Sequence, residues 1–294
     1  MELSWDLLRP VISVPYLPTL GPVHPDAVST DLVAAIVRVA GTGEFLPHDK
    51  DHRWSARKDE HLLVGDVHQD LHRTLIPTIT GCGVLRVHLY GAPEYRPEAL
   101  ATAARLAAVH DATTARVVWF RTEPDPVAAS TRVQLRTFDQ SAPAVDGIGH
   151  LDVLPEPVRV TFGVFAEKLA DEGFAFLHSR IDSVGPVLTT VHDDRVVGAI
   201  GPMETMPDPT GKARLLPQYF GVLPEYRGLG LGRQLWRAAM HWGSENGADY
   251  QLLQTTAGGR LRPVVPGRGT GRPRLRLYHD GVTTTVFGAG HPRP

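Results

Sequence analysis

The residues of this chain best suited to chemistry form a glycine-rich turn, which joins an apolar segment to a helical pattern within residues 220–234. Three of its glycines alternate with other residues, and two arginines flank them: Gly228, Gly230, Gly232, Arg227 and Arg233. Free backbone N–H groups at a helix N-terminus attract anions, and glycines let a phosphate approach the backbone closely. Arginines add charge-assisted hydrogen bonds. The turn is therefore predicted to bind phosphate, the alternative being a glycine turn without a ligand.

The spacing excludes two common nucleotide-binding motifs. A P-loop has Gly-Lys-Ser/Thr after its last glycine, whereas Arg233 and Gln234 follow Gly232 here. A Rossmann fingerprint reads G-x-G-x-x-G, and this turn reads G-x-G-x-G. The pattern Arg-x-x-Gly-x-Gly of Arg227, Gly230 and Gly232 instead resembles the pyrophosphate loop of the GNAT superfamily of acyl-CoA-dependent N-acetyltransferases.

This resemblance implies acetyl-CoA as cosubstrate and no metal. It places the pantetheine arm against the backbone of the strand that precedes the loop, at Phe220 and Val222. The residues expected to bind acetyl-CoA are Phe220, Val222, Arg227, Gly228, Leu229, Gly230, Leu231, Gly232 and Arg233. Acetyl transfer also needs a group that takes a proton from the amine. Glu204 is the candidate base, with Gln218 and Tyr219 as neighbours that bind water; equally, these are an ordinary loop carboxylate and ordinary strand residues.

Composition and charge narrow the class of protein. The 294 residues suffice for two domains, and 42% of them are hydrophobic. The formal charge of −2 gives no reason to expect nucleic acid as a partner. The single Cys82, the N-terminus without a signal-like segment and the lack of a long apolar run predict a cytoplasmic protein without a membrane span.

The second half has a regular order of predicted elements. A helix is expected over 160–176, ending near Gly173, followed by a hairpin of strands 187–191 and 196–200. A strand over 215–222 then leads into the loop, a helix over 231–245 ends at Asn246-Gly247, and a strand follows over 250–255. This is the element order that the resemblance implies for residues 150–256.

The first half contains an echo of the second. Pro93-Glu-Tyr-Arg96 repeats Pro224-Glu-Tyr-Arg227, and both follow an apolar strand and precede an alanine-containing helix and a further strand. We interpret this as an internal duplication, with a chance match of two β–α–β units as the alternative. Pro97 and Ala99 replace Gly228 and Gly230, which removes a donor and adds a Cβ. Residues 1–142 are therefore predicted to be a degenerate GNAT-like domain that binds no CoA, with 123–147 as the connection.

Two other candidate sites are weaker. His68 and His72 are four residues apart, but Gln69 stands where a zinc protease needs Glu, so a solvated helix face is favoured over a metal site. Cys82 lies between two glycines, and we expect a small buried residue rather than a nucleophile.

The C-terminal residues 260–294 depart from the resemblance. GNAT domains continue with a helix that carries a tyrosine serving the thiolate, and then with a strand that starts Gly-Phe. Here an Arg-, Gly- and Pro-rich tail follows, which could be a basic tail or an RNA-contacting segment. Shifting the frame by one nucleotide over Arg260 to Thr283 allows a sequence with the tyrosine and the Gly-Phe. A frameshifted ending, which leaves the terminal strand missing, is our hypothesis.

The sequence thus predicts an α/β fold with mixed central sheets and flanking helices, arranged as two GNAT-like domains in tandem. Residues 1–142 form the degenerate domain, 143–259 the catalytic domain with the acetyl-CoA site, and 260–294 the atypical tail. The predicted function is acetyl transfer from acetyl-CoA to the amine of a small molecule by direct attack. The alternative is a catalytically weak CoA-binding or sensing protein, and a homodimer is compatible with the sequence.

Overall fold

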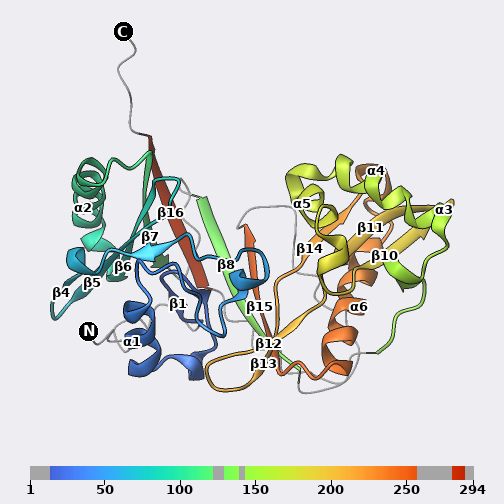
Figure 1. Ribbon diagram of the computed structural model, residues 1–294, viewed down its shortest axis with the longest axis horizontal. Helices are drawn as coiled ribbons and strands as arrows, with labels where there is room; N and C mark the ends of the chain where they lie inside the picture. Colours follow the sequence, from blue (N-terminus) through green and yellow to red (C-terminus); the bar gives the residue numbers. More distant parts are fainter. Residues whose placement is uncertain (1–13, 122–128, 139–142, 257–279, 289–294) are drawn as a thin grey trace, which may run out of the picture.

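The computed structural model describes residues 14–121, 129–138, 143–256 and 280–288, which form two lobes side by side (Figure 1). The α-helices are α1 (Thr30–Arg38), α2 (Arg96–Val109), α3 (Glu156–Arg159), α4 (Thr161–Lys168), α5 (Phe174–His178) and α6 (Leu231–Glu245). The strands of the first lobe are β1 (Tyr16–Leu17), β2 (Gly21–Pro22), β3 (His61–Leu62), β4 (His68–Gln69), β5 (Arg73–Ile79), β6 (Val84–Gly91) and β7 (Thr114–Arg121). The remaining strands are β8 (Ala129–Thr137), β9 (Ile148–His150), β10 (Leu188–His192), β11 (Arg195–Gly201), β12 (Thr205–Pro207), β13 (Ala213–Leu215), β14 (Tyr219–Val222), β15 (Tyr250–Thr256) and β16 (Asp280–Gly288).

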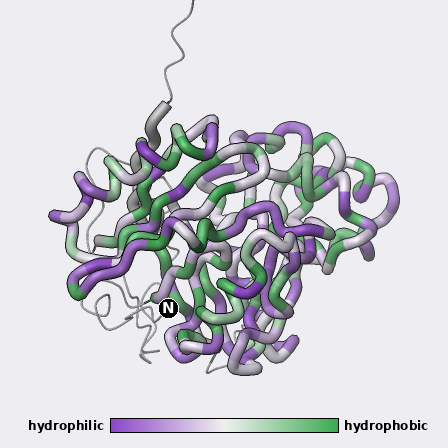
Figure 2. Tube along the Cα trace, turned by 60° about the vertical axis from the view of Figure 1, so that its left-hand side comes forward, coloured by the Kyte–Doolittle hydropathy of each residue, from purple (hydrophilic) through white to green (hydrophobic). Residues whose placement is uncertain are grey.

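Two main sheets, a large mixed one and a smaller antiparallel one, pack with these helices, which confirms the predicted α/β class. The larger sheet has the order β12-β13-β15-β8-β16-β7-β6-β5-β3, with β4 paired to β5. The smaller sheet has the order β14-β11-β10-β9. Figure 2 shows hydrophobic segments towards the inside of the chain trace and hydrophilic ones in several outer loops, as expected for sheets that pack against helices.

The two halves exchange strands in the middle of the large sheet. Strand β8 follows β7 in the chain but pairs antiparallel with β15 of the second half, from Thr131–Thr256 to Thr137–Tyr250. Strand β16 follows β15 but pairs antiparallel with β7 of the first half. Strands β8 and β16 also pair with each other, so the sheet runs unbroken from one half into the other.

This exchange corrects two expectations from the sequence. Residues 123–147 are more than a connection, because they contain the nine-residue strand β8. The expected loss of a terminal strand is wrong as well, since β16 lies in the tail and pairs on both sides. The frameshift hypothesis itself concerns residues that are mostly outside the described part of the chain.

A split in one predicted strand separates the two sheets. The strand expected over 215–222 is interrupted at 216–218 and forms β13 and β14. Strand β13 pairs parallel with β15 in the large sheet, whereas β14 pairs antiparallel with β11 in the small one. Because the two pieces join different sheets, β14 and β15 diverge beyond residue 216 and β14 is left as an edge strand.

The helix expected over 160–176 is also divided. α4 ends at Lys168, and Gly173 adopts a left-handed conformation with φ of 89° before α5 begins. A Cβ at Gly173 would overlap the ring of Tyr219, so the break lets this ring pack against the backbone. Helix α6 spans 231–245, as expected. Asn246 is its C-cap residue, and Gly247 follows with a φ of 71°.

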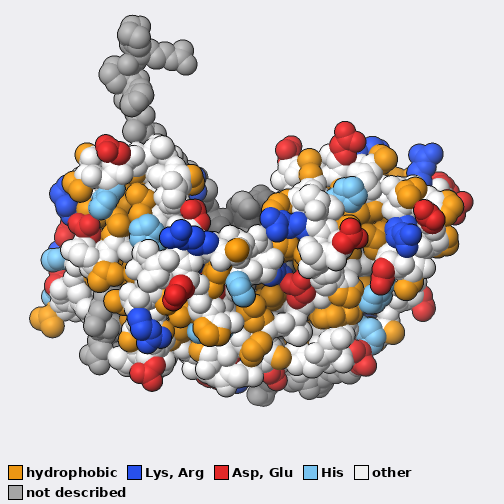
Figure 3. Space-filling model, viewed as in Figure 1, with side chains coloured by type: hydrophobic (Ala, Val, Ile, Leu, Met, Phe, Trp, Pro, Cys, Tyr) orange, Lys and Arg blue, Asp and Glu red, His pale blue; other side chains and the backbone are white. Residues whose placement is uncertain are grey.

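The surface shows no large patch of one charge in the view of Figure 3, where acidic and basic side chains are interspersed. Within the described ranges, no helix is long and apolar enough to cross a membrane. The same residues contain no group of three or more metal-ligating side chains that could hold an ion.

Candidate active site

The glycine-rich turn leads directly into helix α6, with Gly230 as the N-cap residue. Gly228 and Gly230 have φ angles of 88° and 85°, in the left-handed region that favours glycine. No heavy atom lies within 4 Å of the position that a Cβ would take at either residue. No side chain hydrogen-bonds to the helix cap, and the first N–H groups of a helix lack partners inside it. An open, donor-rich surface suited to an anion therefore faces outward from this turn.

Arg227 fastens the turn to its surroundings. Its Nε donates to the carbonyl of Val222 at 2.8 Å, and an Nη donates to Glu172 Oε1 at 2.9 Å. The Val222 bond closes the turn onto the strand that precedes it, and the Glu172 ion pair ties it to the segment between α4 and α5. These contacts indicate that Arg227 holds the shape of the loop.

The backbone of β14 has one edge without a neighbouring strand. Leu223 N–H donates to Val197 C=O at 2.9 Å, which sets the alternation of the antiparallel ladder. The N–H and C=O groups of Gly221 and Tyr219 therefore point towards β11, and those of Phe220 and Val222 point away from it. The sequence predicted these last two residues as the polar edge for an extended ligand.

The remaining residues of the predicted cofactor set surround the turn. Gly232 packs against the ring of Phe220, whose Cζ would lie 3.2 Å from a Cβ at this position. Close packing of the first helical turn on β14 therefore requires glycine here. Leu229 and Arg233 are exposed, and Leu231 is half-buried against the cores beneath the helix.

Glu204 is bound inside the protein by both carboxylate oxygens. Oε1 accepts from the backbone N–H of Gly185 at 2.9 Å, and Oε2 pairs with Arg53 Nη1 at 3.1 Å. Arg53 also donates to the carbonyl of Pro217 at 2.7 Å, at the interruption between β13 and β14. Arg53 comes from the first half, so this ion pair connects the two halves next to the start of β14 at Tyr219.

Gln218 lies in the same interruption. Its Oε1 accepts from Gln251 Nε2 at 2.8 Å, and its Nε2 donates to the carbonyl of Leu216. Gln251 is on β15 and is fully buried. The Gln218–Gln251 hydrogen bond crosses the place where β14 and β15 begin to diverge.

Tyr219 is half-buried in a cluster of aromatic rings that comes from both halves. The ring centroids of Trp54, Phe176 and Tyr219 are 5.4–6.3 Å from one another. Burial raises the pKa of the Tyr219 hydroxyl above its usual value, so the group stays protonated at neutral pH.

Two arginines accompany these rings. The Arg53 guanidinium lies 4.5 Å from the centroid of Trp54, and that of Arg180 lies 4.8 Å from the centroid of Phe176. These two arginines and the rings of Trp54 and Phe176 were not predicted as site residues, because they lie in segments far apart in the chain and no motif contains them.

The matching position of the first half is built differently. Helix α2 begins at Arg96, directly after the short 3-10 turn Pro93–Tyr95, with no glycine loop between them. The Arg96 guanidinium lies 4.4 Å from the ring of Trp119, a fully buried residue of β7. A side-chain stack therefore occupies the region next to the start of this helix.

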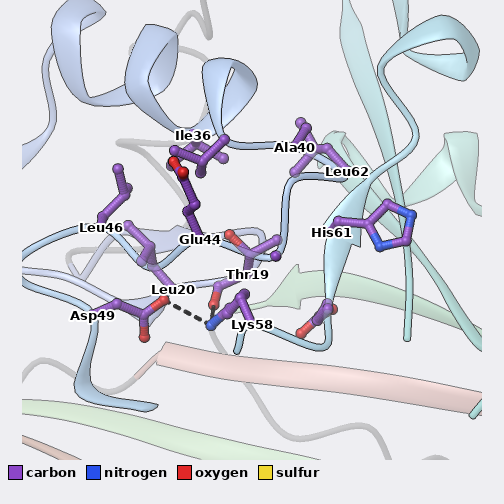
Figure 4. Close-up of a pocket in the computed structure, with 13 residues that line it drawn as sticks. Thr19, Leu20, Ile36, Ala40, Glu44, Leu46, Asp49, Lys58, His61 and Leu62 are labelled. Atoms are coloured by element: carbon purple, nitrogen blue, oxygen red, sulfur yellow. Dashed lines mark hydrogen bonds and ion pairs between the residues drawn. The ribbon is translucent and has the colours of Figure 1, made fainter. Parts of the chain in front are cut away.

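The first half contains a cavity beneath α1 that measures about 20 Å³, which is too small for a nucleotide (Figure 4). Apolar residues such as Ile36 and Leu46 line it together with charged residues such as Glu44. Lys58 bridges Asp49 at 2.8 Å and the carbonyl of Thr19 at 2.7 Å beside it. These contacts fasten the surrounding loops to one another.

The two weaker candidates from the sequence are corrected by the structure. His68 is in the exposed strand β4 and His72 follows it in a turn, so the pair does not lie on a helix. Cys82 is exposed in the turn between β5 and β6, with Sγ 3.1 Å from Thr80 Oγ1, and is not the buried residue that we expected.

Comparison with known protein families gives a match for part of this chain. Residues 154–260 match the acetyltransferase (GNAT) family. No curated protein matches the chain in sequence.

Three solved structures match this chain at low identity. A GCN5-related N-acetyltransferase from Sphaerobacter thermophilus is 18% identical, with a TM-score of 0.44, over 75% of this chain and 78% of that one. A tandem GNAT protein from the clavulanic acid biosynthesis pathway is 18% identical, with a TM-score of 0.40, over 76% and 80%. A GNAT-family acetyltransferase from Colwellia psychrerythraea is 10% identical, with a TM-score of 0.41, over 88% and 98%. The family assignment depends on the match at 154–260.

Proposed function

We propose that this chain, which carries an acetyltransferase (GNAT) family domain over residues 154–260, is an N-acetyltransferase that uses acetyl-CoA. The observation that carries the proposal is the open turn at Gly228 and Gly230, which caps α6 next to the free edge of β14. When bound, acetyl-CoA supplies the acetyl group as a thioester: the amine forms the new C–N bond, the C–S bond breaks, and the amine proton balances the departing thiolate.

The residues of the turn fit the diphosphate of this cosubstrate. Left-handed glycines without neighbours leave room for phosphate oxygens, and the N-terminus of α6 provides backbone donors and the positive end of a helix dipole. Leu231 and Gly232 would donate from the first turn of the helix. Arg233, exposed beside them, would add positive charge. Arg227 acts through the loop, which it holds in this conformation.

The free edge of β14 would bind the extended arm. The outward N–H and C=O groups of Phe220 and Val222 are available to amide groups, although the Val222 carbonyl already accepts from Arg227. Because β14 runs from Tyr219 to Val222 towards the turn, an arm that starts at the turn reaches Tyr219 last. The reacting end of the site is therefore at Tyr219 and the interruption 216–218.

The proton of the amine needs an acceptor at this end. Glu204 was the base suggested by the sequence, but both its oxygens already accept hydrogen bonds, so we assign it the role of positioning Arg53 and the Pro217 carbonyl. We assign proton transfer to water held by the Tyr219 hydroxyl; Gln218, whose amide already bonds to Gln251 and Leu216, lies next to it in the chain. The protonated Tyr219 hydroxyl can donate to such a water or to the thiolate.

The acceptor is proposed to be the amine of a small molecule, and the protein to act in the cytoplasm. Two carboxylates near β14 are already paired, Glu204 with Arg53 and Glu172 with Arg227. Neither is therefore free to bind a basic protein tail.

A weak CoA-binding or sensing protein is the second candidate, favoured by the engagement of Glu204. Two measurements separate the candidates: calorimetric titration with acetyl-CoA, and thiol release from acetyl-CoA with a panel of amines. An enzyme binds acetyl-CoA and releases thiol faster when an amine is present. Binding without amine-dependent release identifies the sensor, and absence of binding refutes both.

A further inference from the structure

The aromatic cluster at the seam of the two halves lies at the Tyr219 end of β14, away from the glycine turn. Trp54 follows a 3-10 turn of the first half, Phe176 lies on α5, and Tyr219 begins β14. Phe176 is 39% exposed, which is high for a large apolar side chain that already contacts two other rings. The cluster therefore presents a partly open aromatic wall at the reacting end of the site.

The charges around this wall differ in whether they are paired. The guanidinium groups of Arg53 and Arg180 lie over its rings. The nearby carboxylates of Glu204 and Glu172 are paired with Arg53 and Arg227. Arg53 is neutralised by Glu204 at 3.1 Å. Within the described part of the chain, Arg180 has no carboxylate within ion-pair distance, and its guanidinium contacts the ring of Phe176. One exposed positive charge thus remains at the wall.

This arrangement discriminates among amine acceptors. A polyamine would bring further positive charges towards Arg180, and repulsion between like charges disfavours it. A carboxylate would form charge-assisted hydrogen bonds with the planar guanidinium. An apolar or aromatic group on the same molecule would gain from contact with the exposed part of Phe176.

We propose that the acceptor is an amine that also carries a carboxylate and an apolar group, the chemistry of an amino acid, and that Arg180 binds its carboxylate. This inference depends on the proposed acetyl transfer for its setting. The Trp54–Phe176–Tyr219 wall receives the apolar group, and Arg53, held by Glu204, keeps Trp54 in place. The specificity residue, Arg180, is outside the acetyl-CoA turn.

The test compares three probes that differ in charge: L-phenylalanine, phenethylamine, which is the same molecule without the carboxylate, and spermidine. Thiol release from acetyl-CoA gives KM for each, and calorimetry gives the affinity of each probe without a need for turnover. We expect L-phenylalanine to bind at least tenfold more tightly than phenethylamine, and spermidine to bind most weakly.

The variants are R180A and R180K, with R195A as a control for loss of an exposed arginine at the far end of β11. R180A should raise KM and Kd for L-phenylalanine about tenfold, leave phenethylamine unchanged, and leave acetyl-CoA affinity unchanged. R180K should restore part of the affinity, and R195A should behave as the wild type.

The possible failures are distinguishable. Failure to bind acetyl-CoA would refute the proposed function, whereas the calorimetric comparison of L-phenylalanine with phenethylamine still tests the carboxylate site. Equal affinity for these two probes, binding of neither, or an R180A variant with unchanged L-phenylalanine affinity would each overturn the assignment of Arg180.

Discussion

The β–α–β units of the two halves share the sequence Pro-Glu-Tyr-Arg but use it differently. In the first half the helix begins at this arginine, Arg96, whereas α6 begins only at Leu231, four residues after Arg227. The extra residues are the glycine turn. Arg96 stacks on Trp119, while Arg227 bonds to the backbone of its own strand and to Glu172. The two units therefore differ mainly in the residues just before the helix, and this glycine turn separates the unit proposed to bind acetyl-CoA from its counterpart in the first half.

The two units nevertheless depend on each other through the exchanged strands. A chain truncated after residue 279 would lack β16, and β7 and β8 would both lose a ladder partner in the centre of the sheet. We expect loss of the cooperative thermal transition and aggregation, because two unpaired edges become available for pairing with other chains. Circular dichroism and light scattering test this. A chain truncated after residue 288 keeps β16 and should melt like the full chain; if both truncations melt alike, the exchanged strand is not required.

Equivalent strand positions in the two β–α–β units, five residues before the shared Pro-Glu-Tyr-Arg, carry residues of different acid sensitivity. His88 on β6 matches Tyr219 on β14, but it is fully buried, and burial lowers the pKa of His88 to about 4. As the pH falls, His88 therefore takes up a proton in the unfolded chain, where its pKa is about 6.5, before it does so in the folded protein. The stability associated with neutral His88 is fully present above about pH 6.5 and is lost as the pH falls towards 4.

We expect the wild type to lose roughly 3 kcal/mol of unfolding free energy over this range through His88 alone, from about 1.4 kcal/mol per pKa unit. The variant H88N should lose correspondingly less between pH 7 and 4, although it starts from a lower stability. Denaturant unfolding at several pH values measures the slopes. The control H192N removes an exposed histidine and should keep the wild-type slope; equal slopes for H88N and the wild type would contradict the assignment.

The open glycine turn should be the site of CoA binding. G230D introduces a carboxylate and a Cβ where phosphate is proposed to lie, and we expect acetyl-CoA affinity to fall at least tenfold, about 1.4 kcal/mol. Titration calorimetry measures this.

G211D is the matched control for that variant. Gly211 has a φ of 86° and equally open surroundings, but it lies in the loop between β12 and β13, away from the turn. Both variants should lose similar stability through left-handed backbone strain, and only G230D should lose affinity. Unchanged affinity in folded G230D would remove the turn from the site.

The paired arginines give the smallest expected effect and the most direct comparison. R227A removes two hydrogen bonds that hold the turn, so acetyl-CoA affinity should fall several-fold to tenfold. R96A should leave affinity unchanged and lower the unfolding free energy by about 1 kcal/mol through loss of the stack on Trp119. Equal losses of affinity would mean that the first half also binds the nucleotide.

Much of the local structure near the site could be predicted from the sequence. The limits of α6 follow from the glycines before it and from Asn246-Gly247 after it, and the hairpin of β10 and β11 follows from apolar runs around a polar turn. These signals are local, because they depend on backbone conformations that only certain residues adopt.

The sequence could not predict which strands would pair at a distance. Strand β8 was expected to be part of a connection because proline-containing stretches, 123–126 and 141–143, lie on both sides of it. Its place beside β15 and β16 depends on partners more than 100 residues away. The division of 213–222 into two strands follows from β15 and β11 competing for opposite ends of one segment.

The α/β class and the glycine turn that leads into α6 follow from the sequence alone, since each depends on neighbours in the chain. The pairing of Glu204 with Arg53 and the meeting of Trp54 with Phe176 and Tyr219 follow from the tertiary structure. Each of these contacts of Arg53 and Trp54 joins segments more than 120 residues apart in sequence, so burial and charge pairing select it only after the two halves have packed together.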